Sequence, residues 1–170
     1  LSELFLGTVL LLFFIFNIQW YIWIITLFLF ILSYHDVKEQ AISQNLVHIF
    51  LTICTLSFIL FTLNINNLLL PFIFTIFFLI LNLIKKSFGM GDILVLLGLG
   101  ILINWQQYLV MFWLGILVAL LYSLIIIVKD KVSVKTTKVP MIPFFTISFV
   151  LTILYGTQIY FFLLKLMGIW

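Results

Sequence analysis

The sequence predicts an all-α, polytopic transmembrane helix bundle, and two observations lead to this fold class. First, 66% of the 170 residues are hydrophobic and only 8% are charged, whereas a soluble domain carries roughly 25% charged residues. Second, the apolar residues form long runs separated by short polar breaks, as in helices that cross a bilayer. The chain leaves no room for a soluble domain of any size, so residues 1–170 are expected to form a single transmembrane domain.

About seven apolar runs qualify as membrane spans, each of which needs roughly 17–25 apolar residues. The runs are Leu4–Phe16, Tyr21–Tyr34, Leu46–Leu63, Leu68–Ile84, Ile93–Ile103, Tyr108–Val128 and Pro143–Leu164. The first, second and fifth are short, so we expect that their flanks extend them or that they start inside the bundle. In the fifth run, Gly98 and Gly100 would permit a close helix contact, because small residues let two backbones approach.

The polar breaks between the runs alternate in charge. One set is short and neutral, and it consists of Asn17–Gln19, Asn64–Asn67 and Asn104–Gln107. The other set holds seven of the eight lysines, and it consists of His35–Gln44, Lys85–Asp92 and Lys129–Pro140. If each run crosses the membrane once, Lys165 alone lies on the opposite side. The positive-inside rule then makes the lysine-rich side cytoplasmic.

Two acidic residues in the lysine-rich breaks are the candidate functional groups. Asp36 follows the second apolar run, and Asp92 ends the segment Gly89-Met90-Gly91-Asp92 before the fifth run. An ionisable residue in such an apolar setting is costly and is a functional-site hypothesis by default. If the spans alternate as predicted, both carboxylates lie at the same membrane face. That arrangement is the minimum that an intramembrane aspartic protease requires.

A pair formed by Asp36 and Asp92 has the chemistry to hydrolyse a peptide bond. An ionised carboxylate takes a proton from water while a protonated one donates to the scissile carbonyl. Asp92 would lie at a helix N-terminus, where the helix dipole favours the ionised form, and Asp36 near a helix C-terminus. We therefore expect Asp92 to be the base and Asp36 the acid. Gly89 and Gly91 lack a Cβ atom and would let an extended substrate backbone come close.

Each acid also has a simpler explanation. Asp36 could be a loop acid beside Lys38, and Asp92 could cap the free N–H groups at a helix start. Their joint occurrence at one membrane face favours the catalytic pair. His35 could tune the pKa of Asp36, although an interfacial histidine is the simpler interpretation. With two histidines and one cysteine, the sequence predicts no metal site.

Several of these segments resemble the type IV prepilin peptidase family, the GxGD-type aspartic proteases of bacterial membranes. Gly89-Met90-Gly91-Asp92 matches the second aspartate motif of that family in full. Asp36, followed six residues later by Ile42, resembles the first motif, with Ser43 in place of the usual proline. Val139-Pro140-Met141-Ile142-Pro143-Phe144 resembles the late Pro-Phe-x-Pro-Phe segment.

The resemblance implies a membrane aspartic endopeptidase that cleaves the leader of type IV prepilins or pseudopilins at the cytoplasmic face of the bacterial cell membrane. Competence pseudopilins are the expected substrates, held by their transmembrane helix within the lipid bilayer, and nucleic acid is not an expected partner. Asp36 and Asp92 would be catalytic, without metal or cofactor. The residues expected to bind substrate or shape the site are Gly89, Met90, Gly91, Pro140, Pro143 and Phe144.

The start of the chain also fits the resemblance. Ser2-Glu3-Leu4 and the apolar run after it resemble the start of the second span in the family. Family members usually carry a further span and a cytoplasmic N-terminal region before this point, and we expect both to be missing here. That region, often with paired CxxC motifs, is linked to N-methylation of the product. Methylation with S-adenosylmethionine is therefore expected only where such a region exists.

Two other functions fit the same pair of acids. Presenilin-like and signal-peptide-peptidase-like proteases share the GxGD motif, but they are longer and place both aspartates within spans. A small proton- or cation-coupled transporter or channel subunit would use Asp36 and Asp92 as a relay. That alternative predicts both acids at mid-membrane with a water path through the bundle, whereas the peptidase predicts both acids near one face.

Overall fold

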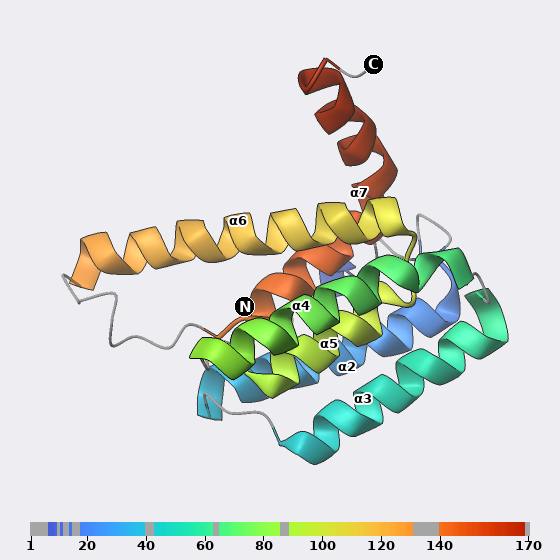
Figure 1. The fold of residues 1–170 in the computed structure, drawn as a ribbon, viewed down its shortest axis with the longest axis horizontal. Helices are drawn as coiled ribbons and strands as arrows, with labels where there is room; N and C mark the ends of the chain where they lie inside the picture. The colour runs from blue at the N-terminus through green and yellow to red at the C-terminus, as the bar shows by residue number, and fades with distance from the viewer. Residues whose placement is uncertain are drawn as a thin grey trace.

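The computed structural model describes residues 7–9, 11, 14, 18–39, 43–62, 65–85, 89–130 and 140–168, and this part of the chain is helical and contains no strand. The α-helices are α2 (Trp20–Glu39), α3 (Gln44–Ser57), α4 (Leu69–Lys85), α5 (Met90–Gly100), α6 (Trp105–Asp130) and α7 (Ile142–Leu166). A π-helical segment, η1 (Phe58–Thr62), extends α3, and a 3₁₀ turn, η2 (Ile65–Asn67), precedes α4. Five helices, α2, α3 with η1, α4 with η2, α6 and α7, are long and apolar enough to cross a membrane. The predicted all-α, multi-pass membrane fold is therefore confirmed (Figure 1).

The fifth predicted span differs from the others. The helix at this position, α5, has 11 residues, which makes it about 16 Å long, whereas the hydrocarbon core is about 30 Å thick. By itself, therefore, α5 does not cross the membrane. The first predicted span, Leu4–Phe16, lies mostly outside the described residues, and the other five predicted spans fall on the five long helices.

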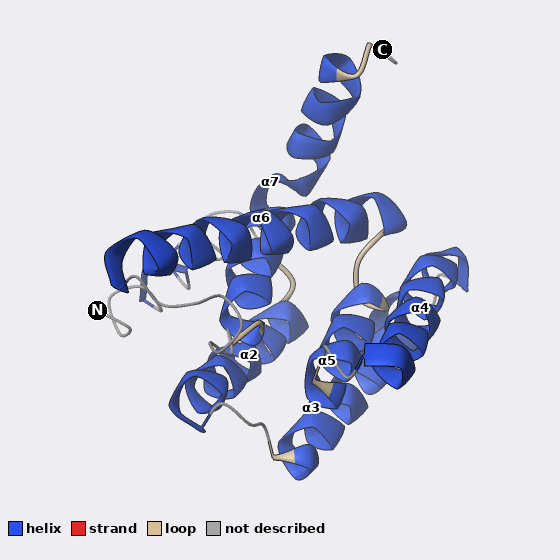
Figure 2. Ribbon diagram, turned by 60° about the vertical axis from the view of Figure 1, so that its left-hand side comes forward, coloured by secondary structure: helices blue, strands red, loops and turns tan. Residues whose placement is uncertain are grey.

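The short helix α5 lies at the centre of the bundle. It packs mainly against α3 and α4 and also contacts α6 and α7 (Figures 1 and 2). Its buried residues are Ile93, Val95, Leu96, Gly98, Leu99 and Gly100. A helix that is apolar on most of its surface is stable only when protein or lipid surrounds it, and here neighbouring helices do so. The N-terminal turn of α5, which carries Asp92, is only partly buried, since Met90 is exposed and Asp92 is half-buried.

Helix α2 presents one stripe of residues to the core. Ile25, Leu29 and Leu32 are fully buried, and their spacing of four and three residues places them on one helix face. Asp36 continues this stripe four residues later and is also buried. The face that packs α2 into the bundle thus carries the carboxylate inward at its end.

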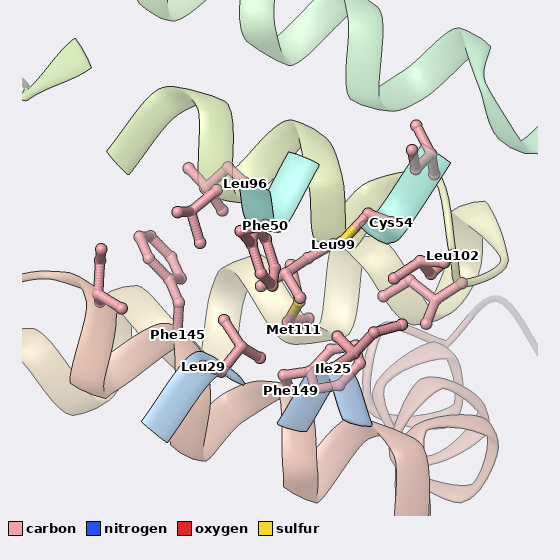
Figure 3. Close-up of a cluster of buried hydrophobic side chains, with 14 of the residues drawn as sticks. Ile25, Leu29, Phe50, Cys54, Leu96, Leu99, Leu102, Met111, Phe145 and Phe149 are labelled. Atoms are coloured by element: carbon pink, nitrogen blue, oxygen red, sulfur yellow. The ribbon is translucent and has the colours of Figure 1, made fainter. Parts of the chain in front are cut away.

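The core joins α5 to the helices around it (Figure 3). Leu96 and Leu99 of α5 belong to the same buried cluster as Phe50 of α3, Leu29 of α2 and Phe145 of α7. No polar group is needed to hold this cluster together, because tight packing and dispersion between buried side chains stabilise it. The cluster fixes the relative positions of α2, α5 and α7.

The three neutral polar breaks meet at one end of the bundle, as their predicted alternation requires. The Nδ2 atom of Asn67 donates a hydrogen bond to Oδ1 of Asn104 at 3.0 Å. Gln19, Asn67, Asn104 and Gln107 all line one cavity of about 440 Å³. Half of the residues in the lysine-rich breaks lie outside the described part of the chain, and the cytoplasmic orientation remains a prediction.

Gly98 and Gly100 permit close helix contacts, as expected from the sequence. A Cβ atom on Gly98 would lie 3.0 Å from a ring carbon of Phe50 on α3. A Cβ atom on Gly100 would lie 2.6 Å from Cγ of Pro71 on α4 and 2.7 Å from Cε2 of Tyr108 on α6. The absence of a side chain at these positions lets α5 approach three neighbouring helices.

Replacing Gly100 with alanine should destabilise the fold by about 1–3 kcal/mol, the usual range for overpacking a core. The added Cβ would overlap the rings of Pro71 and Tyr108, and rings cannot bend away as a flexible chain does. Thermal unfolding in detergent micelles measures the effect. Gly7→Ala is the matched control, because nothing lies within 4 Å of its added Cβ. Equal unfolding temperatures for the two variants would contradict the close approach.

Candidate active site

The Asp36 carboxylate meets the start of α7. Its Oδ2 atom accepts a hydrogen bond from the Ile142 N–H at 3.1 Å, and the Met141 backbone N–H also donates to this carboxylate. Asp36 is 7% exposed, so it is neither a loop acid nor a surface acid. Pro140 and Pro143 flank the two donors and have no N–H of their own. The Pro140–Pro143 segment thus directs both of its N–H groups to one carboxylate.

This contact also caps helix α7. Met141 is the N-cap residue of α7, and a proline occupies the first turn, where a missing N–H costs nothing. The first N–H groups of a helix have no partner within the helix, and Asp36 accepts hydrogen bonds from those of Met141 and Ile142. The partial positive charge of the helix N-terminus in turn favours a negative carboxylate beside it. Asp36 therefore links two helices and is stabilised in its ionised form by this contact.

The other predicted late-motif residue, Phe144, has a different environment. Its ring packs against Tyr122 of α6, with ring centroids 5.2 Å apart, and its side chain is buried. This contact holds α7 against α6. Pro140 and Pro143 therefore flank the Asp36 contact, whereas Phe144 contributes packing between α6 and α7.

Asp92 lies in the first turn of α5, three residues after the N-cap residue Gly89. The Gly89 backbone donates a hydrogen bond to the Asp92 carboxylate, so the side chain reaches back to the helix start as in a capping box. Its Oδ1 atom is buried and has no hydrogen-bond partner within the described residues. A buried polar atom left unpaired is costly and calls for an explanation. Capping accounts for one oxygen of Asp92 and not for the other.

Asp36 and Asp92 lie within electrostatic reach of each other. Burial, together with the negative charge of Asp36, raises the pKa of Asp92 to about 7; Asp92 lies outside the five membrane-spanning helices. A like charge nearby disfavours the ionised form of a carboxyl group. The structure thus brings the two predicted acids into one electrostatically coupled pair, in which the charge of Asp36 makes Asp92 harder to ionise.

Gly89 provides space for the Asp92 carboxylate. A Cβ atom at Gly89 would lie 2.9 Å from Oδ2 and 3.5 Å from Cγ of Asp92. The neighbouring Met90 side chain is 57% exposed, and Gly91 is half-buried. The glycine at position 89 was expected to admit a substrate backbone, which stays a prediction. In the structure, the Asp92 carboxylate lies beside the position that a Cβ atom would take.

The basic and acidic side chains next to Asp36 in the sequence have partners on α2 itself. Nδ1 of His35 lies 3.4 Å from Oε1 of Glu39, and Nζ of Lys38 lies 5.8 Å from the centroid of the Tyr34 ring. These contacts favour the simpler interpretation of His35. In the described part of the chain, no three His, Cys, Asp or Glu side chains gather closely enough to hold a metal ion.

A sequence profile of the type IV leader peptidase family matches residues 23–124. The chain belongs to this family. The match covers more than half of the chain and includes both acids of the coupled pair, whereas the Pro140–Pro143 segment lies beyond it. No curated protein and no solved structure gives a significant match. The chain is therefore a multi-pass membrane peptidase of the leader-peptidase family.

The backbone donors of this peptidase site were not identified from the sequence. Met141 and Ile142 were noted only as part of a proline-containing motif, since apolar side chains give no sign of a polar role. The available signal was the spacing of Pro140 and Pro143, which leaves two N–H groups between two residues that have none. Only the packing of α7 against α2 shows where those N–H groups point.

Gly89→Ala should lower leader-peptidase activity by about 10- to 100-fold, the size of effect that a misplacement of about 1 Å produces. The new Cβ would push the Asp92 carboxylate away. Since the carboxylate is the end of a flexible side chain, the fold should adjust at little cost. Activity per folded molecule is the measurement, and Gly7→Ala is the control. Full activity in Gly89→Ala would show that the position of the Asp92 carboxylate is unimportant.

Proposed function

We propose that this peptidase is an aspartic endopeptidase that cleaves the leader of a type IV prepilin or pseudopilin with Asp36 and Asp92 as its catalytic pair. The observation that supports the proposal best is the coupled pair of carboxylates itself. One acid comes from α2 and the other from α5, and they interact at one end of the bundle. The buried, unpartnered Oδ1 of Asp92 supplies an acceptor or a proton donor for a water molecule or a substrate.

The proposed reaction requires one ionised and one protonated carboxyl group. The ionised group takes a proton from water as the water oxygen attacks the scissile carbonyl carbon, and the protonated group donates its proton to the carbonyl oxygen. When the tetrahedral intermediate breaks, the group that took a proton from water gives it to the leaving amine. The group that protonated the carbonyl oxygen takes that proton back, which restores the starting pair.

The hydrogen bonds favour Asp36 as the base and Asp92 as the acid, opposite to the expectation from the sequence. Asp36 accepts N–H donors from the start of α7, and hydrogen bonds to an ionised group stabilise that form. Asp92 has one backbone donor and one oxygen without a partner among the described residues, and burial together with the charge of Asp36 raises its pKa. The sequence argument placed only Asp92 at a helix N-terminus, whereas the tertiary structure places Asp36 at one as well.

The position of the acids favours a peptidase over a transporter. Asp36 lies one turn from the end of α2, and Asp92 lies in the first turn of α5. Both are therefore near helix ends, whereas the relay predicts both acids at mid-membrane. With the predicted lysine distribution, this end of the bundle faces the cytoplasm, where a prepilin leader would be cut. N-methylation is proposed only for a chain that carries the cytoplasmic N-terminal region of the family.

Asp36→Asn and Asp92→Asn should each abolish cleavage of a prepilin-type substrate by membranes that contain the full-length protein. An amide can neither accept a proton as the base does nor donate one as the acid does, so each change removes one half of the reaction. Immunoblotting for membrane insertion and cleavage of a leader-containing substrate are the measurements. Thr152→Val, at a buried hydroxyl without a described partner, is the control. Retained cleavage in both Asn variants would exclude the catalytic pair and favour the relay.

The acid assignment predicts that cleavage falls as the pH rises through about 7, where Asp92 loses its proton. Below that pH, Asp92 is protonated and able to donate.

A diazo reagent esterifies protonated carboxyl groups, whereas an epoxide alkylates ionised ones. We expect diazo labelling of Asp92, which disappears above about pH 7, and epoxide labelling of Asp36, both mapped by mass spectrometry. The reverse labelling pattern would restore Asp92 as the base.

A further inference from the structure

One turn into the bundle from Asp36, a second polar contact joins α2 to α7. The Oγ atom of Ser33 and the Oγ1 atom of Thr146 lie 2.7 Å apart. Both side chains are buried, and Thr146 is only 1% exposed. Ser33 precedes Asp36 by three residues and Thr146 follows Ile142 by four, spacings that place each pair on one helix face. The two helices are thus linked by two successive polar contacts.

Thr146 also holds the peptide group next to the Asp36 contact. Its hydroxyl lies 2.9 Å from the Ile142 carbonyl oxygen, and the Ser33 hydroxyl lies 2.8 Å from the Leu29 carbonyl oxygen. Each hydroxyl has one proton to donate. In the 2.7 Å contact between the helices, either Ser33 or Thr146 is the donor and the other hydroxyl is the acceptor. When Ser33 donates to Thr146, Thr146 donates to Ile142. The Ile142 residue is then held by its carbonyl oxygen while its N–H donates to Asp36.

From this geometry we infer that Ser33 and Thr146 are positioning residues for the catalytic carboxylate Asp36. Together with Asp36 and Ile142 they form what we call the α2–α7 clamp. The clamp sets the distance and rotation between α2 and the first turn of α7, so that the Ile142 N–H stays on the carboxylate. Neither hydroxyl reaches the reacting atoms, and both act through Asp36. The inference rests on the proposed catalytic role of Asp36.

The experiment compares Thr146→Val with Thr146→Ser in the full-length protein in membranes. Valine keeps the shape of threonine without the hydroxyl, and Ser33 can then donate to Leu29, so no buried donor is left unpaired. We expect Thr146→Val to lower kcat by about 10- to 100-fold with little change in KM for a prepilin-type substrate. Thr146→Ser keeps the hydroxyl and should restore most of the activity. Ser33→Ala should lower kcat similarly, and the double variant should be little worse than either single one.

Thr152→Val is the matched control, since Thr152 lies on the same helix, is fully buried and has no hydrogen-bond partner among the described residues. A purely structural role for Thr146 would lower the amount of folded protein and leave the kcat of the folded fraction unchanged. Equal kcat values for Thr146→Val and Thr152→Val, with Asp36→Asn inactive, would overturn the clamp and leave the catalytic pair intact.

Amide hydrogen exchange tests the clamp without using activity. In Thr146→Val, the Ile142 N–H should exchange faster than in the parent protein, because its hydrogen bond to Asp36 is held less firmly. In Thr152→Val the exchange rate at Ile142 should not change. Unchanged exchange at Ile142 in Thr146→Val would overturn the inference even if Asp36 had no catalytic role. Full cleavage by Asp36→Asn would instead count against the proposed function.

Discussion

The hydrogen bond from the Ile142 N–H to the Asp36 carboxylate is the interaction on which the candidate site depends. A buried carboxylate needs donors, and the first turn of a helix has N–H groups that need acceptors. The contact between α2 and α7 satisfies both requirements. Because Pro140 and Pro143 have no N–H group, the donors in this segment are the N–H groups of the two residues between them. An acid that would be costly in an apolar bundle is thereby held in place by backbone atoms, whose positions the fold determines.

The second requirement is a short helix whose first turn carries an acid against the protein. Helix α5 has neighbours on most sides, and the Asp92 side chain in its first turn is half-buried, with its Oδ1 atom fully buried. Gly89 leaves the space that the carboxylate occupies, and Gly100 lets the other end of the helix approach α4 and α6. Glycines at the two ends of one helix thus serve different purposes, one for the site and one for packing.

Much of the architecture follows from the sequence because lipid imposes strict rules on it. Backbone groups in a bilayer must be satisfied within a helix, so apolar runs identified the spans, and the neutral breaks at Gln19, Asn67 and Asn104 meet at one end as their alternation requires. The fifth run was recognised as short, and α5 has eleven residues. The sequence left open whether its flanks would lengthen this helix, and the structure shows that they do not.

By itself the sequence determined the membrane fold, the family and the two acids, because these depend on composition and on short motifs whose residues are neighbours in the chain. The tertiary structure decided what surrounds each acid. The donors to Asp36 come from a segment more than one hundred residues away, and they are backbone groups, which every residue except proline has. No sequence pattern marks which N–H will face a carboxylate. The Ser33–Thr146 contact likewise follows from the packing of α2 against α7, which brings those two hydroxyl groups together.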